Sequence, residues 1–245
     1  MSLPLKSAPV WLGLAVLVSW QWFGGAINAN ILPPPSAIAQ SLVNDTALWW
    51  PHLLTTLWVT ALGFAIAIVL SIGVSAILDA SPLLKRALYP WLFISQMVPI
   101  IFIYPLLIMG LGFGYGPKIL VVVLVCFFPT CIALTDGLAA TPHSWMQLFK
   151  TYRASAWQTF WRLRWPAALP QFFTGLKVSA TYSVMGAVIG EWMGAQSGLG
   201  VYMLRAYKSF NSTRVFGAVV LVIFTSLLAV GIVRLLQQRY GAHHS

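Results

Sequence analysis

The chain has 245 residues, of which 59% are hydrophobic and only 7% are charged. An ordinary soluble domain carries about 25% charged residues, so this composition excludes a soluble globular protein and indicates an integral membrane protein. The net charge of +10 reflects 14 Lys and Arg residues against 4 Asp and Glu. Because the basic residues lie mainly in short stretches between apolar runs, membrane topology explains them better than nucleic-acid binding does, and we expect no nucleic-acid partner.

A bilayer core needs about 20 apolar residues per helix. The sequence predicts an all-α fold with six spans in a single transmembrane domain, 1–245, and the spans cover 8–27, 53–78, 88–110, 117–138, 172–194 and 215–235. The first run is long for a cleaved signal peptide, and Trp11, Trp20 and Trp22 suit an interface-anchored span, so we expect it to be retained.

Basic residues predict the orientation, because cytoplasmic loops carry an excess of Lys and Arg. A cytoplasmic N-terminus puts both termini and ten basic residues inside: Lys6, Lys85, Arg86, Lys150, Arg153, Arg162, Arg164, Lys177, Arg234 and Arg239. It leaves four outside: Lys118, Arg205, Lys208 and Arg214. We therefore expect a multi-pass protein of the bacterial inner membrane with both termini in the cytoplasm.

The second to fourth spans contain few polar residues. Asp79 precedes Lys85 and Arg86, which predicts a solvated ion pair at the inner surface, and we expect a structural role for Asp136. In the third span Pro99 and Pro105 predict a kink. Its polar residues, Gln96 and Tyr104, are candidates for contact with a polar solute, with an interhelical hydrogen bond as the alternative. The fourth span holds Cys126 and Cys131, which point away from each other on a helix, and the four histidines are scattered, so we expect no metal site and no cofactor.

The sequence of the inner loop, 139–171, predicts a helical hairpin. Thr141 followed by Pro142 predicts a capped helix start, and that helix would run to about Tyr152. After a turn at Arg153–Ser155, a capping box of Ser155 and Gln158 predicts a second helix. Pro166 and Pro170 predict that this helix stops near Arg164 and that a proline hinge leads into the fifth span.

Each hairpin helix has an aromatic or aliphatic side, formed by Trp145, Leu148, Phe149 and Tyr152 and by Trp157, Phe160, Trp161 and Arg164. Two readings stay open on the residues alone. The hairpin either lies at the inner lipid surface as an amphipathic element, or docks into a cytoplasmic partner with its apolar side chains in a groove.

The fifth span carries Gly186, Gly190 and Gly194, spaced four apart, which predicts close helix packing either within one subunit or at a dimer axis. Glu191 lies beside this face. An acidic residue in a span is a candidate for the solute pathway, with a structural ion pair as the alternative. Tyr182 and Ser183 are further pathway candidates.

The loop resembles the EAA loop of permease subunits in bacterial ABC importers. That pattern, Glu-Ala-Ala, three residues, Gly, nine residues and Ile-x-Leu-Pro, falls on Gln147-Leu148-Phe149, on Arg153, and on Leu163-x-Trp165-Pro166. Only the spacing and the proline match strictly. The stretch "ASAWQTFWRLRWPAALPQFFTGLKVSA", with "ILPPPSAIAQSL" and "GAVIGEWMGAQSGLGVYM", is similar to the subgroup that imports sulfonates, taurine, nitrate, riboflavin and thiamine-precursor pyrimidines.

The resemblance implies a type I ABC importer permease fold and a non-catalytic subunit. It implies two permease copies, an ATPase supplied by another polypeptide, and a periplasmic or lipid-anchored binding protein. It implies that the hairpin couples to the ATPase through Gln147, Leu148, Phe149, Arg153, Ala154, Ser155, Trp157, Gln158, Phe160 and Pro166. Within the subgroup, the sequence most resembles permeases for aminopyrimidine thiamine precursors.

Two other classes of function remain as alternatives. A self-sufficient channel or secondary transporter would need intramembrane ion-coupling charges and commonly has broken-helix repeats, and the sequence offers mainly Glu191 and no visible repeat. A membrane-embedded enzyme would need a clustered nucleophile and base or a metal constellation, and the spans contain no obvious one.

Overall fold

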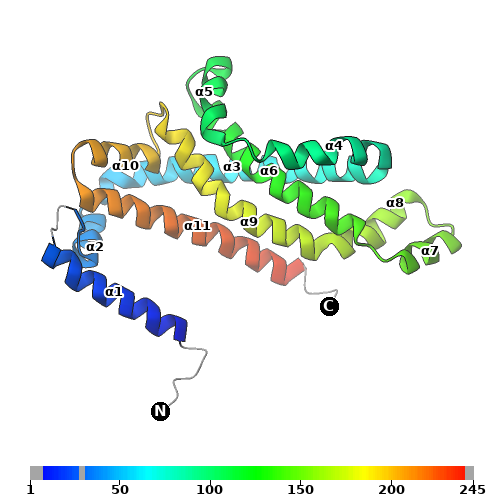
Figure 1. Cartoon of the computed structure of the whole chain (residues 1–245), viewed down its shortest axis with the longest axis horizontal. Coiled ribbons are helices and arrows are strands. Elements are labelled where there is room, and N and C mark those ends of the chain that lie inside the picture. Colours follow the sequence, from blue (N-terminus) through cyan, green and yellow to red (C-terminus); the bar gives the residue numbers. More distant parts are fainter. Residues whose placement is uncertain (1–7, 28–30, 241–245) are drawn as a thin grey trace, which may run out of the picture.

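The computed structural model describes residues 8–27 and 31–240, and every regular element in them is helical, as predicted (Figure 1). The elements are α1 Ala8–Ile27, α2 Pro35–Asn44, α3 Thr46–Ala80, α4 Pro82–Ser95, α5 Ile100–Leu111, α6 Tyr115–Ala139, α7 His143–Thr151, α8 Ala156–Thr159, α9 Trp165–Trp192, α10 Leu199–Lys208 and α11 Ser212–Tyr240. A π-helical turn, Phe160–Arg164, joins α8 to α9.

Within the described residues, four helices are long and apolar enough to cross a membrane: α3, α6, α11 and the continuous helix Ala156–Trp192. Helices α4 and α5 meet the same criterion together, although the pair bends by 100°. The described apolar part of α1, Val10–Gly24, is shorter. The chain is thus a multi-pass membrane protein, while a span formed by α1 stays a prediction.

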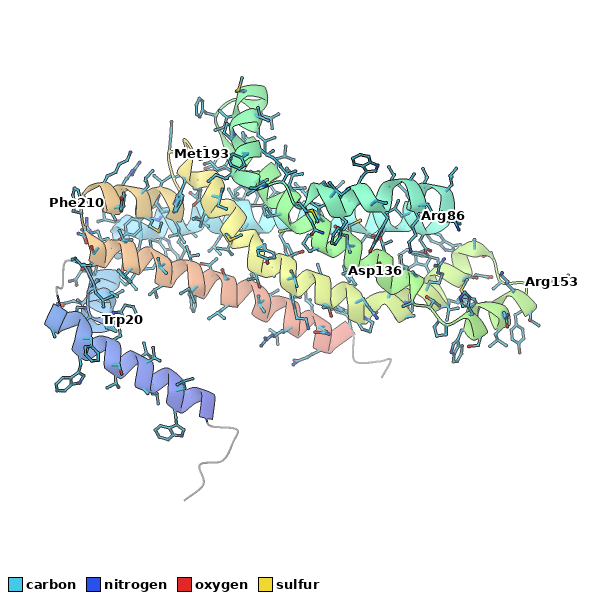
Figure 2. The ribbon with its side chains drawn as sticks, in the orientation of Figure 1. Trp20, Arg86, Asp136, Arg153, Met193 and Phe210 are labelled. Carbon is cyan, nitrogen blue, oxygen red and sulfur yellow. The ribbon has the colours of Figure 1, made fainter. Side chains whose placement is uncertain are left out.

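The long helices α3, α6, α9 and α11 run lengthwise beside one another, and α9 packs most extensively on α6 (Figure 1). The α7–α8 hairpin projects from one end of this bundle, which we call the hairpin end. Helices α2 and α10 lie at the other, which we call the α10 end. Arg153 and Phe210 mark the two ends in Figure 2.

Small residues let α9 approach α6 closely. A Cβ added at Gly175 would lie 2.7 Å from the Cβ of Ala133, and one at Gly186 would lie 2.8 Å from Cγ2 of Val125. Between them, the hydroxyls of Ser179 and Thr130 are 2.8 Å apart and fully buried. The backbones of α6 and α9 are therefore in close contact, and the hydroxyls of Ser179 and Thr130 between them are hydrogen-bonded to each other.

The predicted third span is not one kinked helix but two helices with a break between them. Pro99 has an extended backbone, with φ −62° and ψ 122°, and begins α5 instead of continuing α4. Proline has no N–H and disfavours helix at the preceding residue, Val98, so the break lies directly before it. Pro105, in contrast, is accommodated inside α5.

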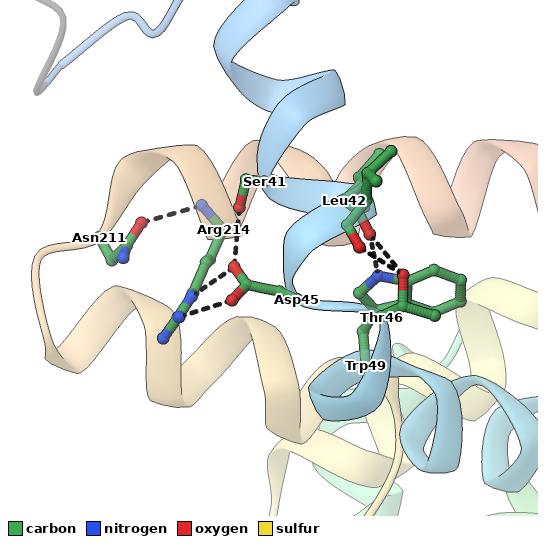
Figure 3. Close-up of polar contacts among 8 residues, drawn as sticks. Ser41, Leu42, Asp45, Thr46, Trp49, Asn211 and Arg214 are labelled. Atoms are coloured by element: carbon green, nitrogen blue, oxygen red, sulfur yellow. Dashed lines mark hydrogen bonds and ion pairs between the residues drawn. The ribbon is translucent and has the colours of Figure 1, made fainter.

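All four acidic residues bond to segments that are distant in the sequence, and Asp45 and Asp136 each join two helices outside the sites described below. Asp45, between α2 and α3, accepts two hydrogen bonds from the Arg214 guanidinium of α11, at 2.9 and 2.8 Å (Figure 3). This bonding holds the pKa of Asp45 below its ordinary value. Asp136 of α6 accepts a hydrogen bond of 2.7 Å from the Tyr89 hydroxyl of α4.

Candidate functional site

The hairpin begins without the predicted threonine cap. Helix α7 starts at His143 with Pro142 as its N-cap, and no side chain caps it. The Thr141 hydroxyl donates instead to the carbonyl of Leu138, at 3.0 Å, so it closes the end of α6.

The hairpin turns at Arg153, in the left-handed region with φ +51°. The amide of Ala154 donates to the carbonyl of Phe149 at 3.0 Å, and the amide of Arg153 donates to that of Lys150 at 2.9 Å. This pair of bonds is the Schellman motif, whose left-handed residue is usually glycine. The EAA pattern has glycine at this position, and the geometry gives the physical reason.

The second arm begins with the predicted capping box. The amide of Gln158 donates to Oγ of Ser155 at 3.2 Å, and the Ser155 amide donates to Oε1 of Gln158 at 2.9 Å. These bonds satisfy two amides that the first turn of a helix otherwise leaves free. The turn and the box together fix the angle between the arms.

The predicted helix stop at Arg164 is wrong. The helix continues through the π-helical turn into α9, with Pro166 and Pro170 in the first turns of α9. Within the π-helical turn, the amide of Trp165 donates to the carbonyl of Phe160, five residues back. This wider turn changes the helical register just before Pro166, which is half-buried, and the prolines therefore do not end the helix.

The hairpin exposes large apolar residues, which we call the hairpin surface: Trp145, Leu148, Tyr152, Trp157 and Trp161. Trp157 is 71% exposed. Phe160, in contrast, packs against the core cluster that Leu134 and Phe172 help to form. Gln147 is exposed, whereas Phe149 and Ala154 are half-buried. The predicted coupling residues therefore divide into an exposed set and a set that anchors the hairpin.

Asp79 does not pair with Lys85 or Arg86 in the described part of the chain. Its carboxylate accepts a hydrogen bond from the Arg164 guanidinium, which also donates to the carbonyl of Leu138 at 3.2 Å. Spacing along the sequence suggested the nearby basic residues, but the fold brings in a residue 85 positions away.

Two of the five pathway candidates line a groove at the α4–α5 break. Gln96 and Tyr182 face a volume of about 550 Å³, whose walls include Pro99, Phe128 and Met185. The wall is mostly apolar and aromatic, and these two side chains supply polar groups to it. Such a lining suits a flat solute with a few hydrogen-bonding atoms.

The other three candidates lie in the packed interior. Tyr104 is buried beside Gly190, and Ser183 is buried with its hydroxyl donating to the carbonyl of Ala180 at 2.8 Å. Glu191 is also buried, at 1% exposure, and belongs to a hydrogen-bonded cluster at the α10 end.

This Glu191 cluster caps helix α10. One carboxylate oxygen accepts from the Thr56 hydroxyl and the other from the amide of Gly200, both at 2.8 Å. The Thr56 oxygen accepts in turn from the amide of Leu199 at 2.8 Å. A carboxylate at a helix N-terminus is stabilised by the free amides and by the helix dipole. Glu191 thereby joins α9 to α3 and α10.

The glycines of the cluster leave no room for side chains. A Cβ at Gly198, which has φ +127°, would lie 2.0 Å from Cδ of Glu191, and one at Gly200 would lie 2.6 Å from the carbonyl oxygen of Val188. The amide of Gly198 donates to Nδ1 of His52 at 3.0 Å. Thr56 was not among the sequence-predicted site residues, because nothing local in the sequence brings α3 to this loop.

The small-residue face of α9 packs inside this chain. Gly186 faces Val125, and Gly190 faces Lys118. The prediction placed Gly194 in the fifth span, but the helix ends before it, at Trp192. Gly194 lies beyond the end of α9 with φ +115°, and a Cβ there would lie 2.9 Å from the Phe113 ring.

Comparison with known proteins identifies the family. The family model described as "Binding-protein-dependent transport system inner membrane component" matches residues 63–242. A "Probable ABC transporter permease protein" of Haemophilus influenzae is 35% identical over 86% of this chain and 87% of its own length. The "Formylaminopyrimidine transport permease protein ThiX" of Halalkalibacterium halodurans is 32% identical over 94% of this chain and 92% of its own. The "Riboflavin transport system permease protein RibX" of Chloroflexus aurantiacus is 30% identical over 98% and 91%. The chain therefore belongs to the binding-protein-dependent transport system inner membrane components and is a permease subunit of an ABC importer.

Proposed function

We propose that this permease subunit moves a flat heteroaromatic solute, a thiamine-precursor pyrimidine, into the cytoplasm. The Gln96–Tyr182 groove is the observation that carries this proposal, because its aromatic and apolar walls suit stacking on a ring and the polar groups of Gln96 and Tyr182 suit ring nitrogens. The relative that transports formylaminopyrimidine supports the same solute class. The relative that transports riboflavin supports a second candidate, because riboflavin is also a flat heteroaromatic molecule.

The hairpin end faces the cytoplasm in this proposal, with both termini inside, and a separate ATPase binds the hairpin surface. Five large apolar side chains exposed on a capped, rigid hairpin form the kind of anchor set that a protein partner buries. A periplasmic or lipid-anchored binding protein delivers the solute at the α10 end. A second copy of the chain, which completes a homodimer, covers the exposed residues at the α4–α5 break.

Transport in proteoliposomes tests the solute. The permease is reconstituted with its ATPase and binding protein, and uptake of labelled aminopyrimidine, riboflavin and taurine is compared with and without ATP. We expect ATP-dependent uptake of the aminopyrimidine, and an exchange of Tyr182→Ala should reduce it about tenfold, since base stacking on an aromatic ring contributes about 1–3 kcal/mol. Uptake of taurine alone would contradict the proposed solute. Uptake by the permease without its ATPase would contradict the importer mechanism.

A further inference from the structure

The backbone that leads from the hairpin into α9 lacks two of the hydrogen bonds of a regular α-helix. Pro166 and Pro170 have no N–H, so the carbonyls of Arg162 and Pro166 lose their usual α-helical donors four residues on. The π-helical turn, Phe160–Arg164, lies directly before them. Prolines and π-helical turns are the places where helices bend. The backbone alone is therefore a compliant connection between the hairpin and the bundle.

One side chain bridges this region to two other helices. Arg164 is the last residue of the π-helical turn, and its guanidinium donates to Asp79 at the end of α3 and to the carbonyl of Leu138 at the end of α6. The Asp79 side chain is 8% exposed and that of Arg164 is 22% exposed. Water therefore has little access to the pair.

Nearby packing between α3 and the hairpin is incomplete. A groove of about 660 Å³ lies between them, lined by Gly73 and Ala76 on α3 and by Met146 and Trp157 on the hairpin. The Asp79–Arg164 pair lines the same groove. A buried ion pair is weak evidence for stability, because apolar residues of similar size often stabilise as much or more. A hydrogen-bonded ion pair, however, depends on the orientation of both side chains, so it can fix the position of Arg164 relative to Asp79.

We propose that Arg164 is a positioning residue for coupling, which makes the hairpin move as one body with the ends of α3 and α6 when the ATPase displaces it. This inference rests on the proposed function, in which the hairpin carries the ATPase. The displacement then reaches three helices, α3, α6 and α9, instead of passing only through the proline-containing start of α9.

Helix α3 extends the consequence to the opposite end. Asp79 and Thr56 lie 23 residues apart on one helix without an intervening proline, which corresponds to about 35 Å. Thr56 is part of the Glu191 cluster that caps α10. The Asp79–Arg164 pair and the Glu191 cluster therefore hold the two ends of the same rod, and motion at the hairpin reaches the α10 end through it.

The experiment compares Arg164→Gln, Asp79→Asn and the exchanged pair Asp79→Arg with Arg164→Asp in proteoliposomes. Arg86→Gln, which removes an exposed guanidinium at the same end, is the matched control. The amount of ATPase that co-purifies, ATP hydrolysis and the solute imported per ATP are measured. Because the last quantity is a ratio, loss of folded protein does not change it.

We expect both single variants to retain the ATPase and to import about tenfold less solute per ATP than the control, as a coupling between sites typically changes by 5- to 150-fold. The exchanged pair should restore most of the ratio. If neither single variant folds, Arg164→Lys, which keeps the charge but loses the planar fork, is measured with the same expectation.

A ratio in both single variants within about twofold of the control would overturn the role of Arg164, as would an exchanged pair as poorly coupled as the single variants. If the unmodified permease retains no ATPase, the proposed function fails, and this role fails with it. If that complex forms and only the ratio is unaffected, the proposed function stands and this inference alone is wrong.

Discussion

The two ends of the molecule use acidic residues in different ways. At the α10 end, Glu191 is buried and bonded to a hydroxyl and a backbone amide, and Gly198 and Gly200 close around it. At the hairpin end, Asp79 is bonded to the flexible, charged side chain of Arg164, beside an exposed aromatic surface. Breaking the contacts at the α10 end would leave buried polar groups without partners, whereas the exposed aromatic residues at the hairpin end can be covered by a protein partner. We infer that the α10 end is built to keep its internal contacts and the hairpin end to receive a moving partner.

The largest expected effect on the free energy of unfolding comes from a steric clash at the α10 end. Gly198→Ala places a Cβ 2.0 Å from the Glu191 carboxyl carbon, at a backbone φ of +127° that side chains disfavour. Glu191 can yield only by losing its hydrogen bonds, so we expect a loss of about 3 kcal/mol or more in the free energy of unfolding. Thermal unfolding of the purified protein measures it. Gly231→Ala in α11, which meets no atom within 4 Å, is the control and should be neutral or slightly stabilising. Equal unfolding temperatures for the two variants would contradict the close packing at Gly198.

A smaller loss should follow from removing one hydroxyl of the Glu191 cluster. Thr56→Val keeps the shape but leaves the Leu199 amide and one Glu191 oxygen without their partner. The expected cost is about 1–3 kcal/mol in unfolding free energy. Thr181→Val removes an exposed hydroxyl that bonds only within α9 and should change stability by less than about 0.5 kcal/mol. Similar unfolding curves for the two variants would show that the cluster does not stabilise the α10 end.

The turns at the two ends offer a comparison in which stability should rise. Arg153 and Phe210 both adopt left-handed conformations, with φ of +51° and +53°, after α7 and α10. Replacement of either residue by glycine relieves about 1–2 kcal/mol of backbone strain but increases the entropy of the unfolded chain. We therefore expect a net gain of about 0.5–1 kcal/mol for Arg153→Gly and for Phe210→Gly, measured by denaturant unfolding. A loss of stability on Arg153→Gly alone would reveal a contact of that side chain that outweighs its strain.

The smallest effect should appear on acidification. The hydrogen bond from Arg214 lowers the pKa of Asp45 below its ordinary 3.8. A lowered pKa in the folded state contributes stability above the unfolded pKa, and that stability is lost as the pH falls from about 4 through the folded pKa. Both side chains are partly exposed, so the contribution should be under about 1 kcal/mol. Asp45→Asn should remove this part of the pH dependence of unfolding, and an unchanged profile would contradict it.

Local features of the fold were predictable from the sequence, whereas contacts between distant segments were not. The capping box at Ser155 and the turn at Arg153 depend on residues within a few positions, and both were predicted. The break at Pro99 was predicted only as a kink, because sequence gives the position of a proline but not the angle. The continuation of α9 through two prolines depends on the π-helical turn, which has no local signature here.

Long-range pairs account for most of what the sequence could not predict. Glu191 and Thr56 are 135 positions apart, and Arg164 and Asp79 are 85 apart. The sequence made Glu191 a candidate because acids are rare in spans, and it predicted an ion pair for Asp79 with Lys85 and Arg86. The observed partners of both acids depend on how the helices pack. The same holds for Tyr182 and Gln96, which share a groove, and for Tyr104, which does not.

Association with the ATPase tests the central claim most directly, namely that the hairpin end faces a moving partner. Trp157→Asp is compared with Tyr207→Asp, an exposed aromatic of α10 at the opposite end, 69% exposed against 71% for Trp157. The ATPase retained on the purified permease is measured at equal amounts of folded protein. We predict that Trp157→Asp reduces the affinity about tenfold or more, as expected for a central interface tryptophan, and that Tyr207→Asp leaves it unchanged. Equal retention by both variants and the unmodified protein would contradict the claim.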